Sequence, residues 1–334
     1  MDRIAGLDYG RALAALFVLL WHEHFFGVGS MFSQTASSPH LPGPADILNA
    51  NILLQAVPFF IFLSCYLYVA RESGMPALKR RAARVTTLHV FWGIAYFVVL
   101  GGIPALISAA ATFQTRPVYA TVTAMGSYYF FSALLVTVVL THIAARLRSS
   151  WLIALTLVSF AAITGMQAAT IKYGIAWTSA FWNPLNYVAI PPLAILLVRH
   201  LEGQGPTLKT ISLLAAAFVL VAAAEWALLV DPVFARNQGY AMPAYTRISP
   251  ALFSCLAICI LLRVRRAPGA VISFMAKYAL AVYCLQAFVL TWTADLKIPL
   301  VLKTAIDLGA CYLLAFLLHR FVFKDQLLAS GHRA

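Results

Sequence analysis

Charged residues are scarce in this sequence, at 10% of its 334 residues, while hydrophobic residues make up 62%. Soluble globular domains carry about 25% charged and about 45–50% apolar residues, so the composition excludes that class. Long hydrophilic stretches are also absent, which leaves no segment that would fold as a separate soluble module. We therefore expect one integral membrane domain over residues 1–334, in contact with the lipid bilayer.

Cysteine and acidic residues are few as well. The five cysteines all fall in apolar segments and show no disulfide or zinc spacing, so we predict no metal site. Only 11 Asp and Glu face 24 Lys and Arg, which gives a net charge of +13. The basic residues sit in short loops between apolar runs rather than on one soluble face. This distribution is typical of a membrane orientation signal, and we predict no nucleic-acid partner.

Apolar runs long enough to span a bilayer recur along the chain. Crossing about 30 Å of hydrocarbon takes about 20 apolar residues in a helix, so we predict an all-α polytopic membrane protein with about ten transmembrane helices. The sixth span contains three prolines and is expected to be kinked. The predicted spans are 10–28, 47–70, 85–108, 120–143, 151–170, 182–198, 211–230, 247–264, 271–293 and 298–322.

The loops predict the orientation of these spans. Most of the Lys and Arg residues fall in one alternating set of loops, which the positive-inside rule assigns to the cytoplasm. Both termini belong to that set, so we predict an N-in and C-in topology. The first apolar run contains Arg11 and His22, which does not suit a cleaved signal peptide, and we expect a retained helix. The predicted location is the bacterial inner membrane.

Arg11 and His22 lie on one face of the first predicted helix. They are eleven residues apart, which corresponds to three turns plus about 20° and a rise of about 16.5 Å. Ionisable groups within a span are functional candidates because burying them is costly. Ala15 and Val18 share this face and would leave room for a substrate arm. For each residue taken alone, a structural role fits as well as a functional one. Arg11 would reach the inner interface, and His22 would be a buried, hydrogen-bonded histidine.

A basic cluster in the loop between the second and third spans is the next candidate. It directly precedes the expected third helix, so guanidinium groups and helix N-terminal amides would together bind phosphates. The positive-inside rule or contact with anionic lipid explains the cluster at least as well. Its members are Lys79, Arg80, Arg81 and Arg84.

Other charges within the spans favour structural roles. Lys303 and Asp307 stand four residues apart in the tenth span and are expected to neutralise each other. Glu225 is expected to reach the outer interface. Glu23 and His24 point away from the face of Arg11 and are expected to cap the helix near the outer interface.

Several of these segments together resemble the membrane-bound acyltransferase 3 family. Leu7 to His22 resembles the family's first helix, with an arginine, ten residues and a histidine. Val57 to Tyr66 resembles its Phe-Phe-x-x-Ser-Gly-Tyr/Phe segment, and Arg81 to Arg84 its R-x-x-R motif. Tyr128 to Phe130 resembles the start of its fourth span, and Tyr278 to Leu290 its penultimate helix. Two positions depart from the family pattern: Cys65 replaces a glycine, and Gln286 stands where many members carry histidine.

The resemblance implies an O-acyltransferase that takes an acyl group, usually acetyl, from cytoplasmic acyl-CoA as co-substrate. The acceptor would be a hydroxyl of a lipid-linked or exported sugar or polysaccharide, with no bound cofactor. His22 would be the general base, since histidine changes protonation near neutral pH. Arg81 and Arg84, with Arg80, Lys79 and Arg11, would bind the donor phosphates.

The predicted outer loop between the seventh and eighth spans offers polar and aromatic side chains suited to sugar recognition. An ordinary interfacial loop fits almost as well. Two other functions stay open: a glycan or small-anion transporter that uses the same cavity, and an acyltransferase that acts on a small glycoside or uses succinyl donors. The candidate acceptor residues are Arg236, Asn237, Tyr240 and Tyr245.

Overall fold

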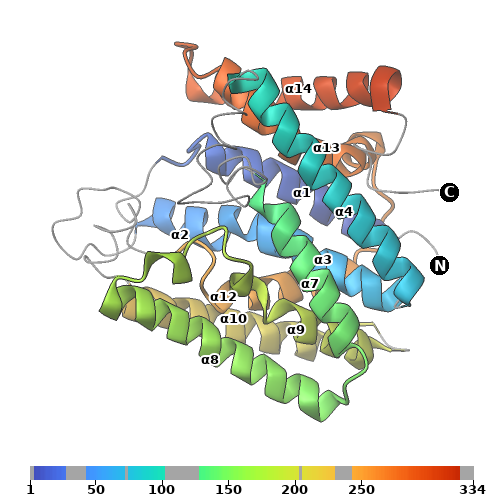
Figure 1. Ribbon diagram of the computed structural model, residues 1–334, viewed down its shortest axis with the longest axis vertical. Coiled ribbons are helices and arrows are strands. Elements are labelled where there is room, and N and C mark those ends of the chain that lie inside the picture. Colours follow the sequence, from blue (N-terminus) through green and yellow to red (C-terminus); the bar gives the residue numbers. More distant parts are fainter. Residues whose placement is uncertain are drawn as a thin grey trace.

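The computed structural model describes residues 4–27, 43–71, 74–101, 128–202, 205–229 and 243–323, and all regular structure in these ranges is helical (Figure 1). Most elements are α-helices, with short 3-10 or π turns (η) between or after them. In chain order they are α1 (Ala5–His22), α2 (Pro44–Asn51), η2 (Leu53–Gln55), α3 (Ala56–Arg71), α4 (Met75–Tyr96), η3 (Phe97–Gly101), α7 (Tyr129–Ala144), α8 (Ser149–Tyr173), η4 (Ala176–Thr178), η5 (Pro184–Tyr187), α9 (Ile190–Leu201), α10 (Leu208–Leu229), α12 (Ser249–Leu262), α13 (Ala270–Trp292), α14 (Leu300–Leu318) and η6 (His319–Phe323).

The helices confirm a polytopic all-α membrane protein. Seven described segments are long and apolar enough to cross a membrane, and α7 and α12 are shorter apolar helices. Together with α1, they supply a helix for each of the ten expected spans. The count of ten and the orientation of the termini stay predictions.

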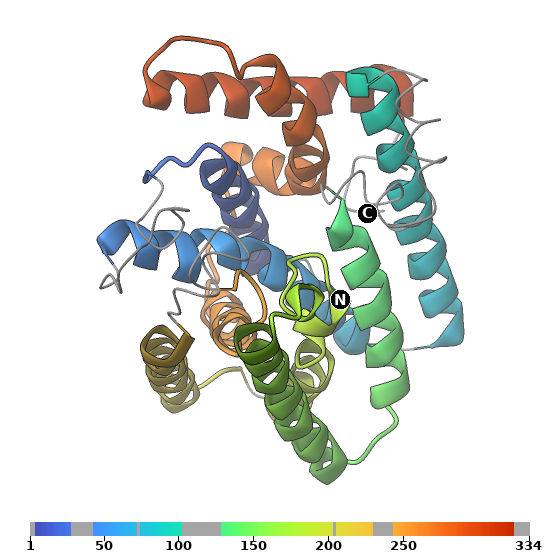
Figure 2. The same cartoon turned by 60° about the vertical axis from the view of Figure 1, so that its left-hand side comes forward.

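The centre of the bundle is formed by α3, which packs against α1, α7, α9 and α12. In the most apolar part of the segment Pro44–Arg71, 78% of the residues are buried, compared with 11% in that of α10. Figure 2 shows α4 (teal) and α10 (olive) on opposite sides of the bundle. Large apolar side chains such as Leu157 of α8 and Leu220 of α10 are 62% and 70% exposed. Helices that are apolar on all faces and exposed are suited to a lipid environment.

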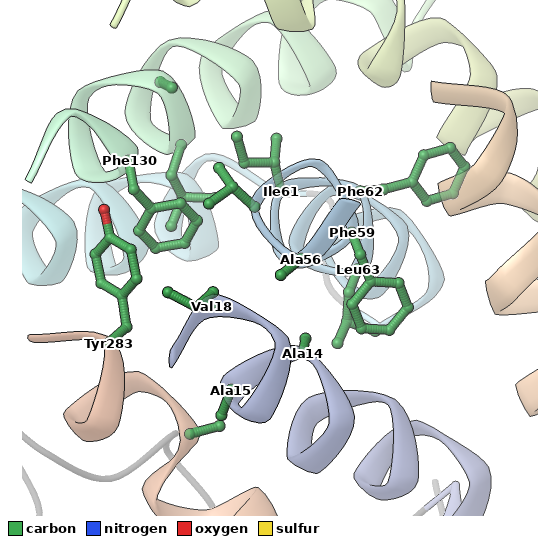
Figure 3. Close-up of a cluster of buried hydrophobic side chains, with 14 of the residues drawn as sticks. Ala14, Ala15, Val18, Ala56, Phe59, Ile61, Phe62, Leu63, Phe130 and Tyr283 are labelled. Carbon is green, nitrogen blue, oxygen red and sulfur yellow. The ribbon is translucent and has the colours of Figure 1, made fainter. Parts of the chain in front are cut away.

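The core lies where α1 crosses α3. Figure 3 shows Ala14 of α1 and Ala56 of α3 at this crossing, and Val18 on the side of Phe130 and Tyr283. Phe130 of α7 and Tyr283 of α13 have ring centroids 5.0 Å apart. Small residues on α1 let the two helices approach closely, and the aromatic rings fill the adjoining space.

The prolines of the expected sixth span lie at the start of helices rather than within one. Pro184 opens the turn η5, and Pro191 and Pro192 occupy the first turn of α9. Proline is tolerated there because the first backbone N–H groups of a helix have no intrahelical acceptor. The segment Pro184–Leu201 therefore has no kink inside α9, and its interruption falls before the helix begins.

A buried polar cluster holds the start of α12, and here the expectation for Glu225 is corrected. Glu225 does not reach the interface: it is buried, and its carboxylate accepts hydrogen bonds from the backbone N–H groups of Ile248 and Ser249, at 2.6 and 3.0 Å. This satisfies donors that a helix start leaves open. Arg247, directly before α12, is 1% exposed and donates to the carbonyl oxygen of Ala50 at 2.8 Å.

Two glycines bring α1 and α12 into close contact. A methyl group on Gly6 would lie 1.7 Å from the carbonyl oxygen of Leu261, and one on Gly10 would lie 2.5 Å from the Leu261 side chain. Small residues four apart on a helix allow such approaches in membranes. At Gly6 the obstacle is backbone, so it cannot move aside by a rotamer change.

We expect Gly6→Ala to lower the free energy of unfolding by about 1–3 kcal/mol, the usual cost of overpacking. The measurement is thermal unfolding of the purified protein in detergent. Gly165→Ala is the matched control, because nothing lies within 4 Å of the added methyl group on α8. Equal melting temperatures for the two variants would show that the α1–α12 contact tolerates separation.

Candidate active site

Arg11 is anchored at the beginning of α1 by an acidic neighbour. Its guanidinium lies 3.0 Å from the carboxylate of Asp8, and their side chains are 13% and 2% exposed. Residues three apart are neighbours on a helix surface, so the ion pair of Asp8 and Arg11 forms within a single turn of α1. The sequence expectation did not assign a role to Asp8, although its spacing to Arg11 carries the signal. Burial of both groups in a membrane protein makes their pairing energetically necessary.

The face between Arg11 and His22 is packed rather than open. Ala15 is 0% exposed and Val18 is 4% exposed, and both belong to the main hydrophobic core. Figure 3 shows these two side chains within that cluster. The room for a substrate arm that the sequence suggested along this face is therefore filled by neighbouring helices.

His22 is the last residue of α1. The residue is exposed, although protein atoms lie around it on most sides. The chain then leaves the helix: His24 adopts a positive φ of 50°, and its ring centroid lies 6.4 Å from that of Trp21. His22 is thus accessible to a reactant at the end of α1, eleven residues after Arg11.

Glu23, which follows His22 directly, ties this end of α1 to α14. Its carboxylate accepts hydrogen bonds from Lys303 at 2.8 and 2.9 Å. Lys303 also bonds Asp307 at 3.2 Å, which confirms the expected pairing of these two residues. Both carboxylates are almost fully buried, with side chains 3% and 0% exposed. Glu23 caps the end of α1 through its backbone N–H, as expected. The sequence did not predict its ion pair with Lys303, because the two residues are 280 positions apart.

The basic cluster lies inside α4 rather than before a helix. Because α4 begins at Met75, the free amide groups of its N-terminus do not coincide with the cluster, and that part of the expectation was wrong. The helix divides the cluster by face. Lys79 and Arg80 are exposed, whereas Arg81 and Arg84 are partly buried. The exposed pair is suited to lipid headgroups and the inward pair to a ligand within the bundle.

Arg81 is fixed to α3 at Ser64, in the segment Val57 to Tyr66. Its guanidinium donates to the carbonyl oxygen of Ser64 at 3.1 Å and lies 5.3 Å from the ring centre of Tyr68. The Tyr68 hydroxyl in turn lies 2.6 Å from Nδ1 of the buried His142 on α7. Arg81 therefore orders the contact between α3, α4 and α7, and His142 is a buried polar residue that sequence reasoning did not single out.

Three other positions define the interior beside these groups. Cys65, which replaces the family's glycine, is fully buried against Thr137 and Thr141 of α7. Gln286 of α13 is buried, and its Oε1 atom has no hydrogen-bond partner among the described residues. His89 of α4 is buried beside Phe131, with ring centroids 6.0 Å apart. His89 is not among the candidates that the sequence indicated.

The candidate acceptor residues fall into two groups. Arg236, Asn237 and Tyr240 lie outside the described residues. Tyr245 is 6% exposed and packs against Tyr129 and Tyr187, with ring centroids 6.0 and 5.8 Å apart. A sugar needs an open ring face for stacking, so Tyr245 acts as a core residue rather than as part of a sugar-binding surface.

Comparison with known proteins shows the family of this chain. The family model described as an acyltransferase domain, Acyl_transf_3, matches residues 4–322. No curated protein and no solved structure matches the chain. The match covers nearly the whole chain, including Arg11, His22 and the Arg81–Arg84 segment. The chain therefore belongs to the acyltransferase 3 family.

Proposed function

We propose that this acyltransferase moves an acetyl group from cytoplasmic acyl-CoA to a hydroxyl of a lipid-linked or extracytoplasmic sugar, in the bacterial inner membrane. The observation that carries the proposal is the accessible His22 at the end of α1, the helix that also carries Arg11. Membership of an acyltransferase family supports the reaction class. The acetyl donor and the sugar acceptor follow from the resemblance of the α1 and α4 motifs.

In this mechanism His22 is the general base. Its free imidazole nitrogen takes the proton of the acceptor hydroxyl while the hydroxyl oxygen attacks the thioester carbonyl carbon. The tetrahedral intermediate collapses with breakage of the carbon–sulfur bond, and the proton passes from His22 to the CoA thiolate. The products are the acyl ester and free CoA. The packed side chains of Ala15 and Val18 require the donor arm to reach His22 beside this face of α1.

The donor phosphates would bind beside the basic cluster within α4 and near Arg11 in the first half of α1. Arg84 is partly buried and lies on the inward side of α4, where a guanidinium group can form bidentate bonds to phosphate. Arg81 already bonds Ser64 and covers Tyr68, so we assign it the role of holding the site together as well. The transporter alternative gains no support, since the face it would need between Arg11 and His22 is filled.

The proposal is tested with purified protein in lipid nanodiscs and isotopically labelled acetyl-CoA. We expect release of free CoA that depends on an added glycan acceptor, and labelled acetyl esters in surface glycans that a deletion strain lacks. Succinyl-CoA in a parallel reaction tests the donor class. Movement of a glycan across the membrane without CoA release would instead establish the transporter.

Arg84→Ala should weaken binding of CoA about tenfold to a hundredfold, because a charge-assisted hydrogen bond contributes about 1.5–3 kcal/mol. The matched control is Arg80→Ala, which removes the same charge from the exposed side of the same helix. Calorimetric titration of CoA into protein in nanodiscs measures both. Equally weakened CoA binding in the two variants would mean that the basic cluster serves membrane orientation rather than donor binding.

A further inference from the structure

Tyr68 of α3 contacts α4 at two points that lie on one side of that helix. Its hydroxyl donates to the carbonyl oxygen of Gly74, directly before α4, at 3.4 Å. Its ring centre lies 5.3 Å from the guanidinium carbon of Arg81. Gly74 and Arg81 are seven residues apart in the sequence, which corresponds to about two helical turns, so both points fall on the same side of α4. The Tyr68 side chain therefore restrains rotation of α4 about its own axis.

His142 of α7 holds the Tyr68 ring in this place. Its Nδ1 atom lies 2.6 Å from the Tyr68 hydroxyl, and both residues are buried. A tyrosine hydroxyl has one hydrogen, which the Gly74 carbonyl accepts, so both contacts are satisfied together when Nδ1 carries the histidine proton and donates to the hydroxyl oxygen. The Nε2 atom has no hydrogen-bond partner among the described residues. In that part of the chain, Tyr68 is thus the one polar anchor of this buried imidazole.

Packing alone does not account for a tyrosine and a histidine at these two positions. Phenylalanine and leucine would fill nearly the same volume, and replacing both partners of a buried hydrogen bond by apolar groups of similar shape is nearly neutral for stability. A hydrogen bond adds a defined direction, because it weakens steeply when its angle departs from linearity. The pair of Tyr68 and His142 therefore fixes where the aromatic ring stands, and with it the guanidinium group of Arg81 over that ring.

Arg81 connects this restraint to the neighbouring arginine of the basic cluster. It donates to the carbonyl oxygen of Ser64 at 3.1 Å, so two residues four apart on α3, Ser64 and Tyr68, hold one guanidinium group. Arg84 follows three residues later, and residues three apart are neighbours on a helix surface. Fixing Arg81 therefore fixes the direction in which Arg84 leaves α4. Bidentate bonds from a guanidinium group to phosphate depend on that direction.

We propose that Tyr68 and His142 are positioning residues for donor binding, which act through Arg81 to orient Arg84 toward the phosphates of acyl-CoA. The inference rests on the proposed function for the identity of the donor. It deepens that function, because it gives a part in donor binding to two residues outside the basic cluster. Both are buried, so they act on the donor through Arg81 rather than by touching it.

Tyr68→Phe keeps the ring and removes the hydroxyl. In calorimetric titration of CoA into the full-length protein in nanodiscs, we expect binding about threefold to tenfold weaker, the range for one neutral hydrogen bond. KM for acetyl-CoA should rise by a similar factor, while kcat stays at the wild-type value because His22 is untouched. The matched control is Tyr278→Phe, which breaks a second tyrosine–histidine bond, 2.9 Å long, between α13 and His319 of η6. It should leave the affinity for CoA unchanged.

Two variants of His142 separate positioning from stability. Tyr68→Phe combined with His142→Leu removes both polar groups, so the melting temperature should stay close to that of the wild type. The affinity for CoA should nevertheless stay as weak as in Tyr68→Phe alone. His142→Asn keeps an amide N–H donor near the place of Nδ1 and should bind CoA nearly as well as the wild type. If the double variant fails to fold, Tyr68→Phe and His142→Asn still decide the question.

A double-mutant cycle tests whether Arg81 carries the effect. In an Arg81→Ala background, Tyr68→Phe should cause no further loss of affinity for CoA, because the link to Arg84 is already broken. Additive losses would overturn the proposal, as would a double variant of Tyr68 and His142 that regains both stability and affinity. Wild-type affinity in Tyr68→Phe would overturn it too, while donor binding by the wild type, and with it the proposed function, would stand. A wild type that binds no CoA would instead overturn the proposed function and this inference together.

Discussion

Replacement of His22 by alanine should lower the rate of acyl transfer by about 10²–10⁴-fold, the usual contribution of a general base. The imidazole lies at the end of α1 and is exposed, so its removal leaves the core packing of Ala15 and Val18 intact. We therefore expect an unchanged melting temperature and an unchanged affinity for CoA, with the whole loss in kcat. Single-turnover kinetics with labelled acetyl-CoA measure the chemical step directly.

The matched control for this prediction is His24→Ala. His24 lies two residues later, past the end of α1. Its replacement by alanine removes an imidazole of the same size. It should retain most of the activity. Normal product formation by His22→Ala at normal expression would remove His22 from the mechanism, and a parallel loss in both variants would indicate a general disturbance of this chain segment.

Replacement of Lys303 by methionine should destabilise the protein by about 3–5 kcal/mol, the cost of breaking a buried ion pair. Lys303 is the cation between Glu23 and Asp307, and its loss leaves two buried carboxylates without their counter-charge. Thermal unfolding in detergent measures the effect. Lys277→Met is the control, since Lys277 is exposed and lies over the ring of Tyr278.

A compensated variant separates stability from activity. Lys303→Met combined with Glu23→Gln and Asp307→Asn removes all three charges, and most of the stability should return because no unpaired charge is left. Glu23 adjoins His22, so we expect this variant to have a lower kcat than the wild type and a normal affinity for CoA. If Lys303→Met is as stable as Lys277→Met, the network does not hold α1 to α14.

The helical architecture was predictable because its signals are local. A run of about 20 apolar residues must satisfy its own backbone hydrogen bonds in lipid, and a helix is the solution that a single segment offers. Hence each expected span has a helix, and the i, i+4 spacing of Lys303 and Asp307 was enough to predict their contact. Boundaries were less predictable: α4 begins ten residues before the apolar run at 85, because the basic residues of Arg81 and its neighbours are good helix formers.

The candidate site was predictable only in part. Helical periodicity placed Arg11 and His22 on one side of α1, but not the side chains of other helices that cover the space between them. The local spacing of Asp8 to Arg11 was present in the sequence and was overlooked. The bonds of Arg81 to Ser64 and of Tyr68 to His142 join different helices, and no local rule specifies such partners.

The sequence by itself thus determined the class of the protein, its helices and the two motifs on α1 and α4, because hydropathy and helical period depend on neighbours along the chain. Only the tertiary structure decided that Glu23 meets Lys303, that Arg84 is partly buried while Arg80 is exposed, and that Arg81 bonds Ser64 of α3. These facts depend on how whole helices pack, and packing is set by the shapes of many side chains at once.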